Sequence, residues 1–365
     1  MVKEVLVIGG TGQIGRRVAK DIQKHSQGNV TITGRKPFYN QNFPVLQFNL
    51  NNPDSIKTLI SNFDLVVHCA GPFHHRNGQV LKHCIEQGIN YIDVSDHRAF
   101  HLQVADYHQA AVEAGVTAIL HTGVFPGISN LMARKGVATL DQTESIHLNY
   151  LVAGSGGAGL TVMRTTFLGL QSHFSVWRNG QWQGVIPYSE PETVEFPRYG
   201  EANVYWFDVA ETYTLPHTFA VDTVVTKFAS IPNFYNDLTA LVAHRVPPSV
   251  LKHPLVIEGL ARISLGMART TDLASGIGIA VVVNVSGWQG NQKQQYRLNF
   301  YHDSTAIAAG MGAGSVAQLL LNQEIIQPGV WSVEQAIPIP QFDAMMQQRG
   351  IKIEMNAASP QPDSL

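Results

Sequence analysis

The sequence has few charges and no block of basic residues. Charged residues make up 14% of the 365, and the formal net charge is −2. A protein that binds nucleic acid, or that attaches electrostatically to anionic lipid, usually carries a basic patch, so the composition argues against both classes. It favours a protein that acts on small molecules.

Cysteine and long apolar runs are also scarce. The two cysteines, Cys69 and Cys84, have no spacing typical of a zinc site or a disulfide framework. The longest apolar run, 277–283, is far too short to cross a bilayer, and the N-terminus lacks the pattern of a signal peptide. We therefore expect a cytoplasmic protein without a membrane span.

Short apolar runs alternate with helical patterns over about the first 125 residues. The runs that predict strands are Val5–Ile8, Val30–Thr33, Val45–Phe48, Leu65–Cys69, Tyr91–Val94 and Val116–Leu120. Such alternation is typical of a doubly wound parallel sheet, so the predicted fold class is α/β of the Rossmann type.

After a helix predicted from about Ser129 to Leu140, the pattern becomes strand-rich. Stretches such as "SIHLNYLV" and "GIAVVVNVSGW" predict an inserted α+β domain built on a mixed or antiparallel sheet. The helix "TAIAAGMGAGSVAQLLLN", rich in small residues, and the following "GVWSVEQ" are predicted to return to the first domain. We expect a nucleotide domain at 1–127 plus 304–355, a substrate and dimerisation domain at 128–303, and a flexible tail at 356–365.

The first predicted strand leads into a glycine-rich loop that opens a predicted helix. Gly9, Gly12 and Gly15 form G-x-x-G-x-x-G in the strand–loop–helix context that a dinucleotide site requires. The glycines let the backbone approach a pyrophosphate, and the helix N-terminus offers free N–H groups. The stretch indicates a dinucleotide site, although a vestigial loop in a non-catalytic fold is the alternative.

The end of the second predicted strand, "TITGRK", bears on which nucleotide binds. An NAD site usually has a carboxylate there for the ribose 2′-hydroxyl, whereas this sequence has Gly34, Arg35 and Lys36. A guanidinium pairs well with a 2′-phosphate, so NADP (NADPH) is the predicted cofactor. The alternative is a solvated pair of surface charges.

Two further strand ends are predicted to border the cofactor. "HCAGPF" brings Ala70, Gly71 and Pro72 to the carboxyl edge of the sheet, and "YIDVSDH" brings Asp93, Ser95, Asp96 and His97. The full set of predicted cofactor contacts is Gly9, Gly10, Thr11, Gly12, Gln13, Ile14, Gly15, Gly34, Arg35, Lys36, Ala70, Gly71 and Pro72.

Short-chain dehydrogenases also begin with Gly-Gly-Thr-Gly, but their chemistry needs a Tyr followed four residues later by a Lys. None of the eleven tyrosines has this partner; Tyr107, for example, is followed at that position by Ala111. The sequence therefore argues against a short-chain dehydrogenase.

The segments "GGTGQIGRRVA", "DLVVHCAGPF", "VLKHCIEQGINYIDVSD" and "GVFPGISN" together resemble the saccharopine dehydrogenase-like NADP-binding oxidoreductases. The resemblance covers about the first 130 and the last 60 residues. It implies NADP(H), a Rossmann domain, a mixed-sheet substrate domain and a homodimer. It also implies hydride transfer at the C=N bond of an imine between an amino acid and a carbonyl compound. By matching motifs, it supports Gly9, Gly12, Gly15, Arg35, Ala70 and Gly71 as cofactor contacts.

Several side chains are candidates for proton transfer at such a site. His74 and His75 follow the fourth predicted strand, and Asp96 and His97 follow the fifth, where they can form an acid–base pair. The structural alternatives are hydrogen bonds from the histidines to loop backbone, and a helix cap by Asp96.

Arg164 in the central domain is a candidate for holding a substrate carboxylate, with a structural ion pair as the alternative. His97 and His101 share a helical spacing, but no third ligand of recognisable spacing joins them, so no metal is predicted. For the function we keep two alternatives: reduction of an activated C=C or C=O in a lipid or isoprenoid substrate, and a sensor or scaffold that binds NADP without turnover.

Overall fold

The computed structural model describes residues 2–37, 41–50, 52–157 and 159–358. The chain divides into two compact units. One comprises Met1–Ile128 and Ala306–Arg349, and the other comprises Ser129–Thr305 and Gly350–Leu365. Each unit has its own sheet. The unit that contains residues up to Ile128 is called the first unit, and the other is called the second unit. Within the described residues, no helix has the length and hydropathy needed to cross a membrane.

The first unit contains a seven-stranded parallel sheet in the order β15-β6-β5-β4-β1-β2-β3. Its strands are β1 (Glu4–Ile8), β2 (Asn29–Gly34), β3 (Val45–Gln47), β4 (Leu65–His68), β5 (Asn90–Asp93), β6 (Thr117–Leu120) and β15 (Gly329–Ser332). The first six strands lie in the order 3-2-1-4-5-6, which is that of a Rossmann fold. The α/β fold class is therefore confirmed, and each predicted strand is found with its ends within two residues.

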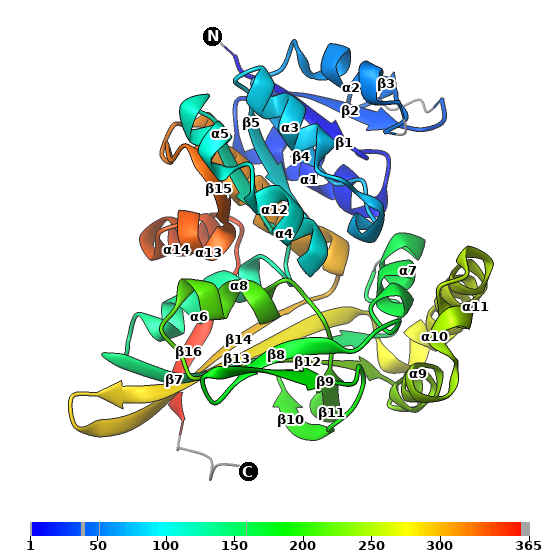
Figure 1. Cartoon of the computed structure of the whole chain (residues 1–365), viewed down its shortest axis with the longest axis vertical. Coiled ribbons are helices and arrows are strands. Elements are labelled where there is room, and N and C mark those ends of the chain that lie inside the picture. Colours follow the sequence, from blue (N-terminus) through cyan, green and yellow to red (C-terminus); the bar gives the residue numbers. More distant parts are fainter. Residues whose placement is uncertain (1, 38–40, 51, 158, 359–365) are drawn as a thin grey trace. The chain divides into compact units, whose positions relative to one another are not determined.

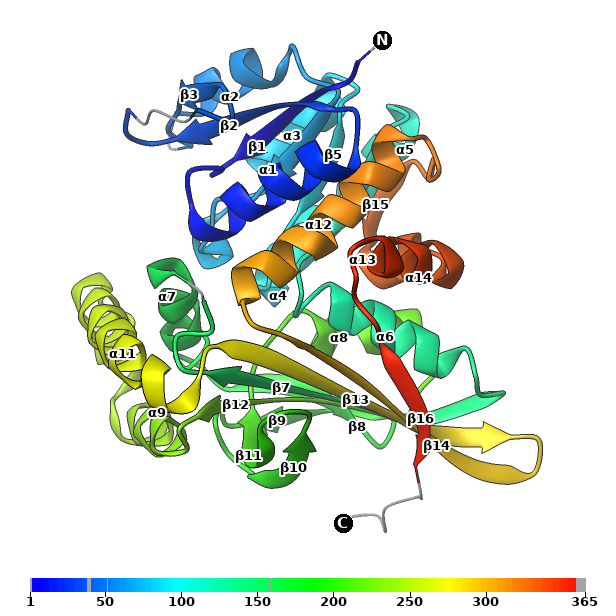
Figure 2. The same ribbon diagram turned by 180° about the vertical axis from the view of Figure 1, so that it is seen from behind.

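Helices cover both faces of this sheet. They are α1 (Gln13–His25), α2 (Pro53–Ile60), α3 (Gln79–Glu86), α4 (Arg98–Ala105), α5 (His108–Glu113), α12 (Thr305–Leu321), α13 (Val333–Ala336) and α14 (Ile339–Gln348), with a 3-10 turn η1 (Phe73–His75). Figure 1 shows α3, α4 and α5 on one face, and Figure 2 shows α1 and α12 on the other. Because both faces are covered, β4 and β6 are buried along their whole length, which explains their continuous apolar sequences.

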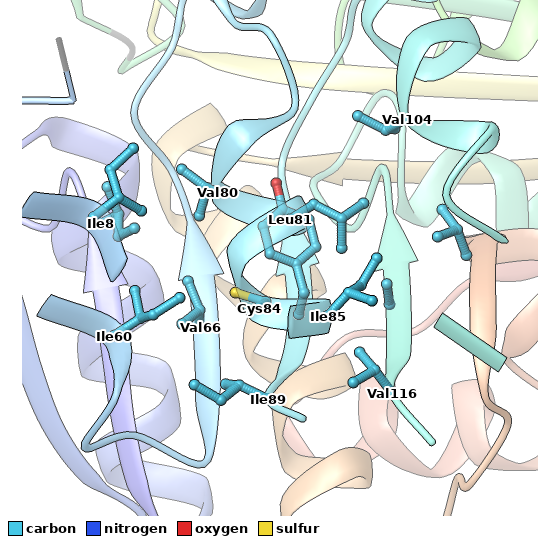
Figure 3. Close-up of a cluster of buried hydrophobic side chains, with 14 of the residues drawn as sticks. Ile8, Ile60, Val66, Val80, Leu81, Cys84, Ile85, Ile89, Val104 and Val116 are labelled. Carbon is cyan, nitrogen blue, oxygen red and sulfur yellow. The ribbon is translucent and has the colours of Figure 1, made fainter. Parts of the chain in front are cut away.

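One core cluster fills the space between the sheet and α3. Val80, Leu81, Cys84 and Ile85 recur at the spacing of one helix face and pack on side chains such as Val66 of β4 (Figure 3). This packing fixes the segment between β4 and α3, and that segment carries η1.

The glycines of α12 allow close packing, as its sequence predicts. A Cβ added at Gly312 would lie 2.1 Å from the carbonyl oxygen of Gly123, and one at Gly314 would lie 2.0 Å from Oδ1 of Asp21 on α1. A larger side chain would fit only if the backbone moved at Gly123, for position 312, or the Asp21 side chain moved, for position 314.

The second unit contains a seven-stranded mixed sheet in the order β10-β11-β12-β7-β13-β14-β16, in which only the β12–β7 pair is parallel. Its strands are β7 (Gln142–Ala153), β10 (Glu192–Phe196), β11 (Gly200–Trp206), β12 (Thr223–Ile231), β13 (Gly278–Gln289), β14 (Gln292–His302) and β16 (Glu354–Ala358). Strands β8 (Phe174–Arg178) and β9 (Gln181–Val185) form a separate hairpin. Its helices are α6 (Ile128–Val137), α7 (Leu160–Leu168), α8 (Glu211–Thr218), α9 (Phe234–Arg245), α10 (Pro248–Leu251) and α11 (Pro254–Ser275).

The C-terminal boundary predicted from the sequence is wrong. Residues 350–355, predicted to close the nucleotide domain, belong to the second unit, because β16 pairs antiparallel with β14 from Asn299↔Glu354 to Gln295↔Ala358. Residues 356–358, predicted as part of a flexible tail, lie in that strand. The rest of the predicted tail, 359–365, lies outside the described residues.

Candidate functional site

The glycine-rich loop lies between the carboxyl end of β1 and α1. Gly9 has φ of 79°, and a Cβ at Gly15 would lie 2.4 Å from the Gly9 carbonyl oxygen, so loop and helix pack backbone against backbone. The N-cap residue Gly12 offers no side-chain hydrogen bond, and a Cβ there would meet only the Gly9 carbonyl oxygen. The first turn of α1 is therefore left open, which fits the pyrophosphate of a dinucleotide.

Hydrogen bonds attach this loop to the end of β2. The Gly9 N–H donates to Thr33 Oγ1 at 3.0 Å, the Thr11 N–H donates to the Thr33 carbonyl at 3.3 Å, and a Cβ at Gly34 would lie 2.7 Å from the Thr11 side chain. Arg35 and Lys36 follow directly and are exposed. The loop that would hold the pyrophosphate and the two predicted phosphate-binding cations therefore lie at the same edge of the sheet.

A second guanidinium lies near Arg35. Arg76 follows η1, and it donates from Nε to the Ala70 carbonyl at 2.6 Å and from Nη2 to the Gly71 carbonyl at 3.3 Å. Burial, and secondarily the positive charge of Arg35, lower the pKa of Arg76. A dianionic phosphate would relieve the repulsion between the two cations, so the residues present fit the 2′-phosphate of NADP.

A cavity of about 270 Å³ adjoins Arg76. Leu50, Ile56 and Val80 give it apolar walls, and His68 and Tyr91 are also among the residues that line it. Burial lowers the pKa of His68 to about 3, so its ring is neutral at pH 7. Its Nε2 is buried and has no hydrogen-bond partner. The cavity thus combines apolar walls with a neutral polar group.

His74 and His97, both predicted catalytic residues, are brought together as a stacked pair. Their ring centroids lie 3.7 Å apart with an interplanar angle of 25°, and both Nδ1 atoms are buried without a partner. Burial first, and neighbouring histidines second, lower the pKa of His74 to about 3 and that of His97 to about 4. Both rings are therefore neutral at pH 7, and neither is an imidazolium acid there. His75 is exposed and lines the cavity.

The structure does not show the predicted acid–base pair of Asp96 and His97: the His97 ring stacks on His74, and its buried Nδ1 has no hydrogen-bond partner. The alternative of a helix cap by Asp96 is not found either: α4 begins at Arg98, its N-cap is His97, and no side chain caps it. Asp96 is partly buried, and burial, with a smaller contribution from the charge of Asp93, raises the pKa of its carboxyl to about 6.

A hydrogen-bonded network at the ends of β5 and β6 centres on Asp93, whose side chain is fully buried. Asp93 Oδ1 accepts from the Ser95 N–H at 3.0 Å, from Ser95 Oγ at 2.6 Å and from the His121 N–H at 3.0 Å. Oδ2 accepts from the Tyr91 hydroxyl at 3.1 Å. Four donors therefore satisfy the carboxylate, and it holds the backbone on both strand ends.

The same network orients two histidines. His121 Nδ1 lies 2.9 Å from the carbonyl oxygen of Ser95, which can only accept, so this nitrogen carries the hydrogen. Burial lowers the pKa of His121 to about 4, so the ring is neutral and its Nε2 is an acceptor. His101 Nδ1 lies 2.9 Å from that Nε2 and must donate to it. In the neutral His101 ring, the hydrogen is therefore on Nδ1.

His121 has φ of 64°, in the left-handed region that residues other than glycine rarely adopt. Such strain persists where the surroundings fix the conformation, and it is most frequent at functional sites. His121 was not among the site residues predicted from the sequence, and His101 was considered there only as a metal ligand. The sequence did contain a signal for His121. It directly follows a buried strand, at the sheet edge where Asp93 ends the neighbouring strand.

Arg164, the predicted substrate residue of the second unit, forms a bidentate ion pair with Glu258. Nε lies 2.7 Å from Oε2 and Nη2 lies 3.1 Å from Oε1, joining α7 to α11. This is the structural alternative that the sequence left open, and a role in substrate binding stays a prediction. Among the described residues, no three His, Cys, Asp or Glu side chains form a group that could hold a metal ion.

The domain family described as the saccharopine dehydrogenase NADP binding domain matches residues 5–119. The match covers less than half of the chain, which over these residues resembles the saccharopine dehydrogenase-like oxidoreductases. The chain is an enzyme, and its cofactor is NADP(H).

The proteins of similar sequence differ in how much of this chain they match. Carboxynorspermidine synthase of Vibrio cholerae is 24% identical over 333 residues, covering 82% of this chain and 80% of that protein. The human saccharopine dehydrogenase-like oxidoreductase is 28% identical over 172 residues, which cover 43% of this chain and 38% of the human protein.

Among solved structures, saccharopine dehydrogenase (L-Glu forming) of Saccharomyces cerevisiae is similar over 98% of this chain and 100% of its own, with a TM-score of 0.68 at 14% identity. An engineered D-amino acid dehydrogenase bound to NADP+ reaches a TM-score of 0.51 at 15% identity, covering 93% of this chain and 96% of its own. At these identities the likeness concerns the fold.

Proposed function

We propose that this enzyme transfers a hydride between NADP(H) and the C=N bond of a substrate derived from an amino acid. The observation that carries the proposal is the similarity to carboxynorspermidine synthase, because it covers 82% of the chain and so extends beyond the NADP-binding domain. The remainder of a Rossmann enzyme usually supplies its substrate contacts.

For the cofactor, we propose that the open first turn of α1 holds the pyrophosphate and that Arg35 and Arg76 hold the 2′-phosphate. Leu50 and Ile56 line the cavity beside Arg76 together with polar residues, and we propose that the adenine ring enters it. When bound, NADPH supplies the hydride that adds to carbon. This chain must then orient the substrate and provide one proton for the nitrogen.

The first experiment titrates the purified protein with NADPH and NADH and follows the cofactor fluorescence. We expect strong preference for NADPH, which is lost in Arg35→Ala. Oxidation of NADPH is then measured with cyclic imino acids that carry a carboxylate, and with α,β-unsaturated ketones as the comparison class. Turnover of the imino acids supports the proposal, whereas turnover of the enones alone overturns its C=N part.

Reduction of an activated C=C or C=O in a lipid is the second candidate. The observation that favours it is the apolar surface of α11, where the exposed fraction of the Leu255 side chain is 75% and that of Ile263 is 62%. An apolar substrate or its carrier would cover such residues. Turnover of enones with long alkyl chains, but not of short ones, would favour this candidate.

We further propose that the enzyme is cytoplasmic, and that it is a homodimer, as its resemblance to the saccharopine dehydrogenase-like family implies. The free thiols Cys69 and Cys84 fit a reducing compartment. Light scattering coupled to gel filtration should give twice the mass of the chain, and a monomeric mass at micromolar concentration would refute the dimer.

A further inference from the structure

We propose that the side chain of His68 recognises the adenine of NADP(H) by accepting, at Nε2, a hydrogen bond from the 6-amino group of the base. The proposal rests on the cofactor placement given above, and it adds a specificity-determining residue to which neither the sequence motifs nor the comparisons assign a role. It is carried by the cavity beside Arg76 and by the hydrogen bonds that fix the His68 ring.

The residues that line this cavity differ in how deeply they are buried. His75 and Asn77 are exposed and form its mouth. His68, Tyr91 and Phe100 are at most 2% exposed and form its inner end. The volume of about 270 Å³ is below the roughly 300–1,000 Å³ of sites that enclose a whole small-molecule ligand. The cavity therefore suits one part of the cofactor, such as its base.

The cavity lies where the adenine is expected. Arg76 lines it, and Arg76 and Arg35 are the two residues proposed to hold the 2′-phosphate. That phosphate is on the ribose to which the adenine is attached, so the base must lie within a few bonds of these guanidinium groups. His68 ends β4, which pairs with β1 in the sheet, so it lies at the same carboxyl edge as the glycine-rich loop.

Hydrogen bonds decide which nitrogen of the His68 ring carries a hydrogen. The Tyr91 hydroxyl donates its single hydrogen to Asp93 Oδ2 at 3.1 Å. It can therefore only accept from His68 Nδ1, which lies 3.0 Å away, so Nδ1 carries the hydrogen. Burial lowers the pKa of His68 to about 3, so the ring is neutral at pH 7 and Nε2 has a lone pair. This nitrogen stays an acceptor as long as Tyr91 donates to Asp93.

Nε2 of His68 has no donor at the inner end of the cavity. It is buried, and no group among the described residues donates to it. The Tyr91 hydroxyl beside it already donates to Asp93 and accepts from Nδ1, and the Phe100 side chain has no polar atom. A buried acceptor without a donor is costly, so a ligand that brings an N–H group to it gains free energy.

Adenine has the complementary edge. Its 6-amino group is an N–H donor, and its flat ring can contact the apolar side chains of Leu50, Ile56 and Val80, which line the cavity. Hypoxanthine has a carbonyl oxygen in place of the amino group, so it would set a lone pair against the lone pair of Nε2. A site built to form a hydrogen bond rejects a ligand that lacks the partner group. His68 should therefore select adenine over hypoxanthine.

The test compares NADPH with its deamino analogue, reduced nicotinamide hypoxanthine dinucleotide phosphate, by fluorescence titration of the full chain. We expect the wild type to bind the analogue at least about tenfold more weakly. Histidine NMR with ¹⁵N-labelled rings should show the Nδ1–H tautomer of His68. Its Nε2 resonance should move to lower frequency when NADPH binds, because the nitrogen then accepts a hydrogen bond, and the analogue should not cause this shift.

His68→Gln is the matched variant, because its amide can present either an oxygen or an NH₂ group. It should bind NADPH within about threefold of wild type but lose the preference over the analogue. His83→Gln on α3, where His83 pairs with Glu86, is the control and should keep the preference. Equal binding of both cofactors by the wild type, an unchanged Nε2 resonance, or a preference that survives in His68→Gln would overturn the proposal. Failure of NADPH to bind the wild type would instead refute the proposed function.

Discussion

Two arginines separated by 41 positions in the sequence come close together at the edge of the first sheet. Arg35 was expected there from its place after the second strand, whereas Arg76 lies there because its guanidinium is fixed by the carbonyls of Ala70 and Gly71. Its positive charge is therefore preorganised, at some electrostatic cost, before any phosphate is present.

We expect Arg76→Ala to weaken NADPH binding about 10- to 100-fold, the usual effect of losing a charged hydrogen bond, and to leave NADH binding nearly unchanged. Arg76→Lys keeps the positive charge but not the hydrogen bonds to the carbonyls of Ala70 and Gly71. It therefore separates the attraction of Arg76 to the 2′-phosphate from its hydrogen bonds to the loop that contains Ala70 and Gly71. The measurement is a fluorescence titration with both cofactors. Equal losses for NADPH and NADH would argue for the bracing alone.

The carboxyl group of Asp96 should make the free energy of unfolding depend on pH, and the direction of this dependence follows from its pKa. Its pKa is raised from 3.8 to about 6 in the folded chain, so the folded state binds the proton more tightly than the unfolded state does. Its contribution is therefore most favourable below about pH 4 and is lost as the pH rises through about 6. Asp96→Asn should raise the free energy of unfolding more at pH 8 than at pH 5, as measured by urea denaturation. The same gain at both values would contradict the raised pKa.

At the scale of elements, the glycines of α12 and α11 differ in how closely other residues pack against them. Gly312 faces the backbone of Gly123 at a distance that excludes a methyl group, whereas a Cβ at Gly259 on α11 would have no described atom within 4 Å. The small residues of α12 therefore allow close packing in the first unit. Gly259 on α11 has no neighbour that would exclude a larger side chain.

We expect Gly312→Ala to destabilise the protein by about 1–3 kcal/mol, the usual cost of overpacking. Gly259→Ala is the matched control and should stabilise by up to about 1 kcal/mol, because alanine favours the helix. Thermal unfolding of both variants decides the point. A neutral Gly312→Ala would mean that α12 shifts without cost.

In the whole molecule, β16 is the last strand of the described residues. β16 closes one edge of the second sheet by pairing with β14, although it follows α14 of the first unit in sequence. Arg349, just before it, is buried and forms an ion pair with Asp21 of α1, at 2.5 Å between Nη2 and Oδ1. The last described residues therefore contribute to both units.

Ending the chain after Gly350 should lower the melting temperature by several degrees, because β14 loses one of its two partner strands while Arg349 keeps its ion pair with Asp21. NADPH affinity should be unchanged, since the glycine loop, Arg35 and Arg76 lie in the first unit. The control ends after Ala358 and keeps β16. If both truncations melt alike, β16 contributes little to the stability of the second unit.

The sequence alone determined the parallel α/β sheet, the glycine-rich loop and the cation at the end of β2. These features depend on patterns within about 10 to 30 neighbouring residues, where alternation of apolar runs and a motif between strand and helix carry the information. Only the tertiary structure decided which distant residues meet. It brings Arg76 near Arg35, His121 to Ser95 and His101, and β16 to β14. These segments lie too far apart in the sequence for a local motif to relate them. The tertiary structure also places the His97 ring against His74, with its Nδ1 buried and without a hydrogen-bond partner, rather than in the pair with Asp96 that the sequence predicted.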